Sequence, residues 1–265
     1  MKKLLAFIAA VMLCIPCVAL ASCGETPIDE ISIVAPASTE ISAGETFTLE
    51  YKTVPEEAAE KIKVNWKISD MTKLSYKNGE FTALTCGTVK VTASVKGSEA
   101  TDEIKLKVKA PKGFSEYSDT GYQLVYPSSW TPSTLGKVQM WSTASGYPNM
   151  NIVTETLNAA YFSSPASAYQ TKIETTYSLM GYTVNFTKPV TVKKSKYLGV
   201  ERVQVDFLYT LTAAGSTTSI HQTQMIFNNA KVNLSCVLTI TYRAEDFNAA
   251  AEKLQETLFS QFMPA

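Results

Sequence analysis

Apolar residues recur at every second position in many short runs of this 265-residue chain, and this alternation constrains the fold more than any other feature. The pattern predicts strands with one buried and one exposed face. In the first part of the chain, turn signals such as Asn78-Gly79 separate five such runs, 31–33, 47–51, 62–68, 89–93 and 104–108. Strands this short, within about eighty residues, predict a small antiparallel sandwich.

Several short motifs occur in a fixed order in the same region. They are Gly44-Glu45-Thr46, Val54-Pro55, Val64-Asn65-Trp66, Asn78-Gly79-Glu80-Phe81-Thr82-Ala83 and Gly87-Thr88-Val89-Lys90-Val91-Thr92-Ala93. Over residues 31–109 this order resembles the group 2 bacterial immunoglobulin-like domains. The resemblance implies an all-β Ig-like sandwich with Trp66 in its core. It also implies a spacer or adhesive module, and it brings no catalytic residues.

A different organisation follows a linker at 110–113, where proline and glycine end the strand pattern. A helix is predicted over 166–180, with Ser164 as N-cap, Pro165 at its first position and Gly181 just after its end. The runs 200–211, 217–227 and 232–242 predict a meander of antiparallel strands. A final amphipathic helix is predicted from about residue 244, and we expect it to cover one face of that sheet.

The strand closed by Tyr126-Pro127-x-x-Trp130, the long helix, the meander and a last helix ending in Ser260-Gln261-Phe262 occur in this order. Together they resemble the PsbP-like family over about 113–262. The resemblance implies an α+β second domain at 114–265, with an antiparallel sheet and flanking helices in an α/β/α sandwich. Members of this fold serve in binding or assembly, and fold alone is weak evidence for function.

The N-terminal segment has the pattern of an export signal. Lys2 and Lys3 precede an apolar stretch at 4–21, and Leu20-Ala21-Ser22-Cys23 follows. This resembles a bacterial lipoprotein signal peptide at 1–22, cut before Cys23, whose side chain then carries lipid such as palmitate. A short tether at 23–30 would link the lipid to the first domain. The alternative is an uncleaved membrane helix, although the segment is short and Pro16 interrupts it.

Charge and cysteine content limit the partners. The chain has 24 Lys+Arg and 24 Asp+Glu, and loss of Lys2 and Lys3 leaves 22 against 24, a net charge of about −2. This balance argues against nucleic acid and against a polybasic membrane patch. Once the signal is removed and Cys23 is lipidated, Cys86 and Cys236 remain as thiols, one in each predicted domain. A disulfide between them is the less favoured alternative, since no local spacing supports it.

The sequence offers little for catalysis. His221 is the only histidine and lies within a predicted strand, so no zinc site of the usual kind is expected. No Gly-x-Ser-x-Gly elbow or phosphate-binding loop occurs. We therefore expect no cofactor, metal or catalytic residue. The lysine group at 188, 193, 194 and 196 is interpreted as a solvated turn, with anionic wall polymer or lipid headgroups as the alternative ligands.

Aromatic residues between 135 and 165 give one candidate ligand patch, formed by Trp141, Tyr147, Tyr161 and Phe162. The alternative is that these rings fill the core beside the long helix.

Two functional hypotheses follow. The first is a non-catalytic, outward-facing protein, lipid-anchored to the bacterial cell membrane, that presents the second domain to a surface protein or glycan. The second is an envelope hydrolase or modifying enzyme, which would require His221 beside a carboxylate and a serine. Solute capture for a transporter is disfavoured by the domain order.

Overall fold

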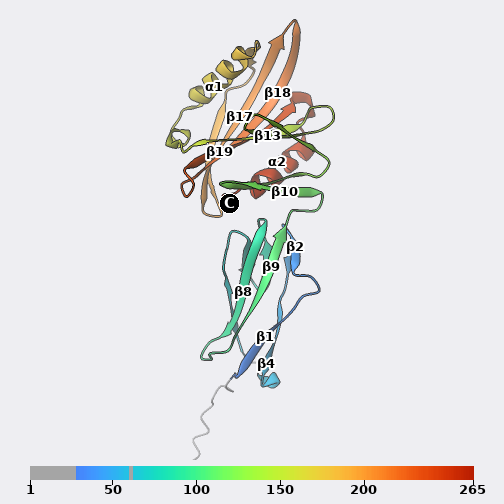
Figure 1. Ribbon diagram of the computed structural model, residues 1–265, viewed down its shortest axis with the longest axis vertical. Coiled ribbons are helices and arrows are strands. Elements are labelled where there is room, and N and C mark those ends of the chain that lie inside the picture. The colour runs from blue at the N-terminus through green and yellow to red at the C-terminus, as the bar shows by residue number, and fades with distance from the viewer. Residues whose placement is uncertain (1–27, 60–61) are drawn as a thin grey trace, which may run out of the picture.

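The computed structural model describes residues 28–59 and 62–265 and consists mostly of β-sheet with two α-helices. Two units lie end to end along the long axis (Figure 1). The last strand of the first unit ends at Lys109, and the first strand of the second unit begins at Phe114.

In the described part of the first unit there are nine strands and a short 3-10 helix, η1 (Glu56–Ala58). The strands are β1 (Glu30–Val34), β2 (Glu40–Ser42), β3 (Thr46–Phe47), β4 (Glu50–Val54), β5 (Val64–Ile68), β6 (Leu74–Lys77), β7 (Glu80–Ala83), β8 (Gly87–Val95) and β9 (Thr101–Lys109). They form three sheets, ordered β2-β9-β8-β5, β3-β7-β6 and β1-β4. The pairing of β2 with β9 is parallel, so the expectation of a purely antiparallel unit is wrong at this edge.

Trp66 lies where the two apolar clusters of this unit meet. Its ring contacts Phe81 edge-on at 5.4 Å between centroids, and it also lies beside Tyr51 and Tyr76. A large aromatic ring at this point joins the two clusters, as expected for a residue between sheets.

Ten strands, two short 3-10 helices and both α-helices make up the second unit. The strands are β10 (Phe114–Asp119), β11 (Tyr122–Pro127), β12 (Thr131–Leu135), β13 (Val138–Ser142), β14 (Asn149–Thr156), β15 (Thr183–Phe186), β16 (Thr191–Tyr197), β17 (Val200–Ala213), β18 (Ser216–Asn229) and β19 (Leu234–Arg243). Eight of them form one antiparallel sheet in the order β12-β13-β14-β19-β18-β17-β15, with β16 also paired to β17, while β10 and β11 pair separately. The predicted meander corresponds to β17, β18 and β19.

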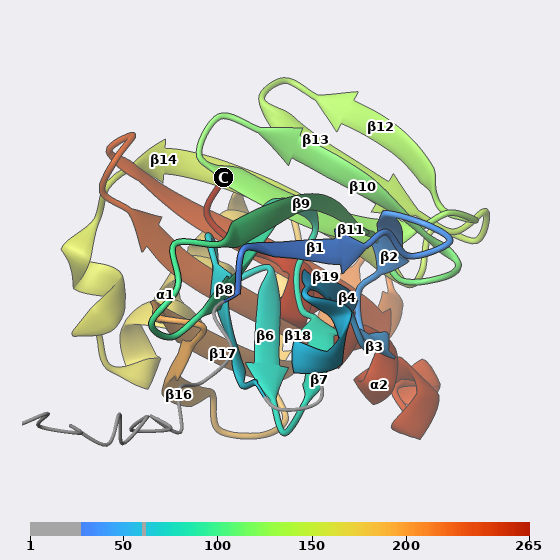
Figure 2. The same ribbon diagram turned by 90° about the horizontal axis from the view of Figure 1, so that it is seen from below.

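The two α-helices, α1 (Ala166–Leu179) and α2 (Ala249–Gln261), cover opposite faces of this sheet (Figure 2). α1 packs through Tyr169 and Ile173. α2 packs through Leu258 and Phe259 onto strand residues that alternate with those facing α1. The alternation along the strands therefore gives the sheet two apolar cores, one beneath each helix.

The helix boundaries differ slightly from the sequence expectation. Pro165 is itself the N-cap of α1, not its first residue. α2 begins at Ala249, because Asn248 accepts hydrogen bonds from the amides of residues 250 and 251 and so caps the helix. Residues 244–246 form a separate 3-10 turn, η3 (Ala244–Asp246).

Side-chain amides join the two units. Gln261, at the end of α2, donates a hydrogen bond to the Leu84 carbonyl at 2.7 Å and accepts one from the Cys86 amide at 3.3 Å. Gln123 of β11 donates to the Cys86 carbonyl at 3.0 Å. Cys86 is 7 % exposed and packs into the core of the second unit, so the turn before β8 is docked onto its neighbour.

Candidate functional site

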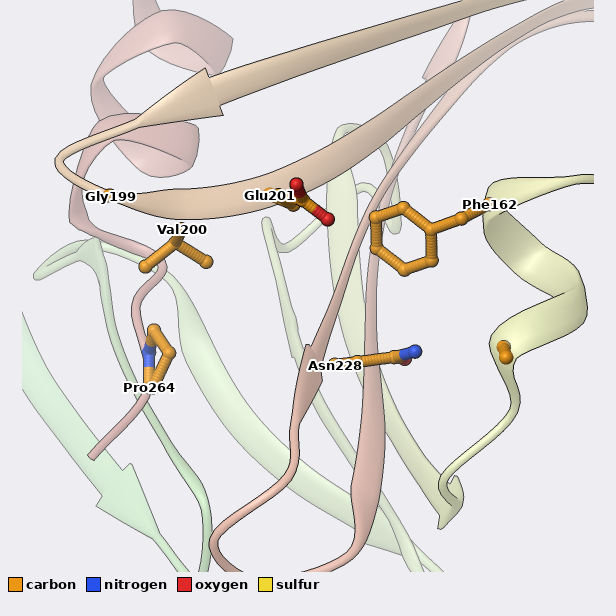
Figure 3. Close-up of a pocket in the computed structure, with 7 residues that line it drawn as sticks. Phe162, Gly199, Val200, Glu201, Asn228 and Pro264 are labelled. Carbon is orange, nitrogen blue, oxygen red and sulfur yellow. The ribbon is translucent and has the colours of Figure 1, made fainter.

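A cleft of about 490 Å³ opens on the second unit. Its lining comes from η2 (Ala159–Phe162), the β16–β17 turn, the end of β18 and the C-terminal tail: Ala159, Phe162, Gly199, Val200, Glu201, Asn228 and Pro264. Figure 3 shows the ring of Phe162 across the opening from Val200 and Pro264, with Glu201 and Asn228 between them. The cleft thus combines apolar walls with one carboxylate and one amide, which is the usual composition of a binding site.

The turn that bounds one side of the cleft has a defined backbone. Leu198 and Gly199 both have positive φ, 48° and 85°. Two successive residues of this kind make the tight turn that joins antiparallel strands with their natural twist. The turn sets the register in which Lys196 of β16 lies opposite Glu201 of β17. Glu201 is thereby held at the rim and remains exposed.

Asparagine side chains hold the opposite wall to the sheet. Asn228 accepts a hydrogen bond from the Ser235 hydroxyl at 2.6 Å, and its Nδ2 donates to the Asn158 carbonyl at 3.4 Å. The Asn158 amide donates to the same hydroxyl at 2.8 Å, and its side chain caps η2 by accepting from the Ala160 amide. Phe162 therefore projects from a turn that is already fixed, and the cleft needs no folding on binding.

A buried arginine holds the third wall, the C-terminal tail. Arg202 is 3 % exposed; its Nη1 donates to the Phe259 carbonyl at 2.8 Å and its Nη2 to the Phe262 carbonyl. Its guanidinium also lies over the Tyr197 ring at 4.7 Å. Burial lowers the pKa of Arg202 to about 10, so it stays cationic at neutral pH and favours the carbonyl end of α2.

The four residues of the predicted aromatic patch do not come together on one surface. Trp141 is fully buried beneath α2, where its ring stacks on Tyr126 at 5.3 Å. Tyr161 is buried on the other face of the sheet, and Tyr147 packs at the margin of the same α1-side core. Phe162 alone of the four lines the cleft. The prediction of a joint patch is wrong, because β13 directs Trp141 to the face opposite η2.

The remaining predicted residues are placed as follows. Cys23 lies outside the described residues. Cys86 and Cys236 are free and buried, and burial raises the pKa of each thiol to about 12, so neither is a reactive thiolate. Of the residues that line the cleft, sequence reasoning had singled out only Phe162. The turn at 199 and the asparagine at 228 carried a local signal, but nothing in the pattern showed that they meet.

His221 lies on the α2 side of β18, against Phe247, with ring centroids 3.7 Å apart. Burial there lowers its pKa below the ordinary value of 6.5. The nearby carboxylate Asp206 accepts from Thr223 at 2.8 Å and from Gln204 at 3.0 and 3.2 Å. Across residues 28–59 and 62–265, no hydrogen bond joins His221 to a carboxylate or a serine. The arrangement that the hydrolase hypothesis requires is not found there.

The described residues contain no cluster of three or more His, Cys, Asp or Glu side chains placed to hold a metal ion. No helix in the described part of the chain is both long and apolar enough to cross a membrane.

Comparisons with known proteins give a limited result. No family model matches the sequence, and no curated protein matches it. Among solved structures, the Ran-binding protein Mog1p of Saccharomyces cerevisiae is similar at a TM-score of 0.35 and 9 % identity, over 56 % of this chain and 95 % of its own. A protein of unknown function from Pseudomonas aeruginosa, PA94, is similar at a TM-score of 0.29 and 14 % identity, over 55 % of this chain and 94 % of its own. Similarities this weak leave the function to be argued from the site itself.

Proposed function

We propose that this chain is a bacterial lipoprotein that binds a partner outside the cell without catalysing a reaction. In this proposal Cys23 carries the lipid, an immunoglobulin-like unit at 31–109 serves as a spacer, and a PsbP-like unit at 114–265 contacts a protein or glycan. The membrane holds the protein through the lipid, since acyl chains contribute about 0.8 kcal/mol for each buried methylene.

The end-to-end arrangement of the two units carries this proposal. β1 begins at Glu30, at the end of the first unit remote from the second, whereas β9 ends at Lys109 beside it (Figure 1). β9 has nine residues, which at about 3.3 Å each span about 30 Å. A lipid attached just before β1 would therefore hold the second unit about one domain length from the membrane surface.

Binding, as opposed to catalysis, is supported by the character of the cleft. Its walls are fixed by Arg202 and by the asparagine network, and it presents the Phe162 ring beside the Glu201 carboxylate. His221 does not line the cleft, because it packs against Phe247 on the α2 side of the sheet. A preformed apolar cleft with few polar groups suits recognition of a side chain or a sugar ring.

Expression in a bacterial host tests the anchor. We expect the wild-type protein to lose residues 1–22, to gain lipid mass and to partition into detergent. The variant Cys23→Ala should do none of these. Cys17→Ala, which changes a cysteine inside the signal, is the matched control and should be processed normally. Digestion of intact cells with added protease tests the outward orientation. An unlipidated wild type, or a protected second unit, would contradict the proposal.

A further inference from the structure

β16 forms an open edge of the large sheet. It pairs with β17 on one side, from Thr191 opposite Asp206 to Tyr197 opposite Val200, and no strand among the described residues pairs with its other side. Alternate residues of this seven-residue strand therefore direct unpaired amide and carbonyl groups away from β17. Such an edge is a ready template for an added strand.

The same strand carries a concentrated positive charge. Residues 188–197 contain four lysines and no acidic residue, and all four side chains are exposed. The salt bridges of the described structure involve other lysines, so Lys193, Lys194 and Lys196 have no ion-pair partner there. Glu201, which lies opposite Lys196 in register, forms no salt bridge with it. This charge is therefore available to an incoming ligand.

The lysines occupy both faces of the strand. Lys194 and Lys196 lie opposite Val203 and Glu201, on the α1 side of the sheet, whereas Lys193 lies opposite Gln204 on the α2 side. A flat anionic surface would meet only one of these sets at a time. A strand paired to the edge would lie about 4.8 Å from β16 and would pass between them, with its own side chains directed to both faces.

Protection against self-association does not by itself explain this charge. The opposite edge of the sheet, β12, is fully exposed and bears no charged residue. It has five residues, and Pro132 lacks the backbone N–H that an added strand would need as a donor. β16 instead has a long free edge and a cluster of one sign of charge.

From these features we propose that β16 binds an extended acidic segment of a partner protein, which adds to the sheet as a further strand. The inference rests on the proposed binding function and names the chemistry of the partner. Main-chain hydrogen bonds supply the pairing, and acidic side chains opposite Lys193, Lys194 and Lys196 set the register. The cleft begins at the turn that closes β16, and it lies beside the path of the added strand.

Fluorescence anisotropy on the full chain in non-ionic detergent tests the proposal. The probe is a labelled twelve-residue peptide of glutamate and threonine, in which acidic residues occur on both faces of an extended strand. Three comparison ligands accompany it: the same peptide N-methylated at alternate amides, polyphosphate, and vesicles of phosphatidylglycerol and phosphatidylcholine. The variant Lys193→Gln/Lys194→Gln/Lys196→Gln is compared with Lys52→Gln/Lys67→Gln/Lys105→Gln, which removes three exposed charges from the first unit.

We expect the peptide to bind with an affinity that falls as salt rises. Loss of the three β16 lysines should weaken it about tenfold, whereas loss of the three remote lysines should leave it unchanged. N-methylation should abolish binding although the charge is kept, because it removes the paired amides. Absence of saturable peptide binding would overturn the proposal. So would equal binding of the N-methylated peptide, or of polyphosphate or vesicles with the same lysine dependence, because charge alone would then explain the interaction. None of these outcomes depends on the lipid, so failure here is distinct from failure of the anchor experiment.

Discussion

Replacement of Arg202 by methionine should loosen the C-terminal tail and weaken the second unit. In the wild-type protein the guanidinium donates to two carbonyls, those of Phe259 and Phe262, at the end of α2. Methionine fills a similar volume but donates no hydrogen bond. The substitution therefore removes both guanidinium hydrogen bonds while it keeps most of the packing.

The structure allows the size of this effect to be estimated. The Phe262 carbonyl is left without a donor, which costs about 1–3 kcal/mol. The Phe259 carbonyl still accepts from the Phe262 amide at 3.3 Å and loses only its hydrogen bond to a charged group, which costs about 1.5–3 kcal/mol. Loss of the contact with the Tyr197 ring adds about 0.5–2 kcal/mol. One contribution stabilises the variant. No carboxylate in the described structure pairs with Arg202, so removal of this buried charge relieves a desolvation cost of about 1–4 kcal/mol. The net expectation is a loss of about 2–3 kcal/mol.

Urea unfolding followed by tryptophan fluorescence measures the loss, since Trp66 reports the first unit and Trp130 and Trp141 report the second. The decrease should be confined to the transition of the second unit. Hydrogen exchange should accelerate at the amides of Gln123 and Met263, which pair with each other.

Two companion variants test the reasoning about Arg202. Arg243→Met removes an exposed guanidinium that also lies over a tyrosine ring, and it should change stability by about 0.5 kcal/mol or less. Arg202→Lys keeps the charge but loses the guanidinium, and its stability should lie between wild type and methionine. The reasoning would be refuted if Arg202→Met lowered the free energy of unfolding by less than about 1 kcal/mol, or by no more than Arg243→Met does. The two hydrogen bonds from Arg202 would then not hold the C-terminal tail.

Three further predictions follow from local contacts. His221 gives the only imidazole resonances of the chain, and its pKa measured by NMR should lie below 6.5 and rise in Phe247→Ala. Because burial lowers the pKa in the folded state, this residue should reduce the free energy of unfolding as pH falls from 6.5 towards the folded pKa. A measured pKa at or above 6.5 would contradict the burial argument. In the native protein a thiol reagent should modify Cys86 very slowly, and Gln261→Ala should accelerate this reaction because it opens the contact between the units; an unchanged rate would show that the glutamine does not hold them together. Gly121→Ala should lower the melting temperature of the second unit, because the backbone there has φ of 89° and the new Cβ would approach a side chain of the β18–β19 loop to 2.8 Å; calorimetry with no shift would disprove this.

The strands were the part of this fold most accessible from sequence. Alternation along 200–211, 217–227 and 232–242 predicted the meander, because each strand has one face toward each core. The structure has β17, β18 and β19 at these positions. The helix cap at Asn248 was missed, since the apolar periodicity continues backward through residues that form η3. The parallel pairing of β2 was not predictable, because nothing in three residues specifies a partner 67 positions away.

The candidate site was much less accessible. Phe162 was singled out as an aromatic residue in an irregular region, but the same reasoning placed Trp141 beside it. A period of two assigns residues to the faces of their own strand, and it does not say which faces of different strands coincide. The cleft also depends on Gly199 and Pro264, whose contribution comes from chain path and not from side-chain chemistry. Such sites become visible only when the tertiary arrangement is known.

The pairing of Gln123 with Met263 has a consequence for how the protein is made. Each of the two residues donates its backbone amide to the carbonyl of the other, although they lie near opposite ends of the second unit's sequence. Arg202 holds the residue just before Met263. The first unit contains all of its own strands by residue 109, so it can fold while the rest of the chain is still being synthesised. The second unit must wait until its last few residues emerge. Until then the surface that receives Cys86 is incomplete, so a chain truncated before Gln261 would combine a folded first unit with an unfinished second one.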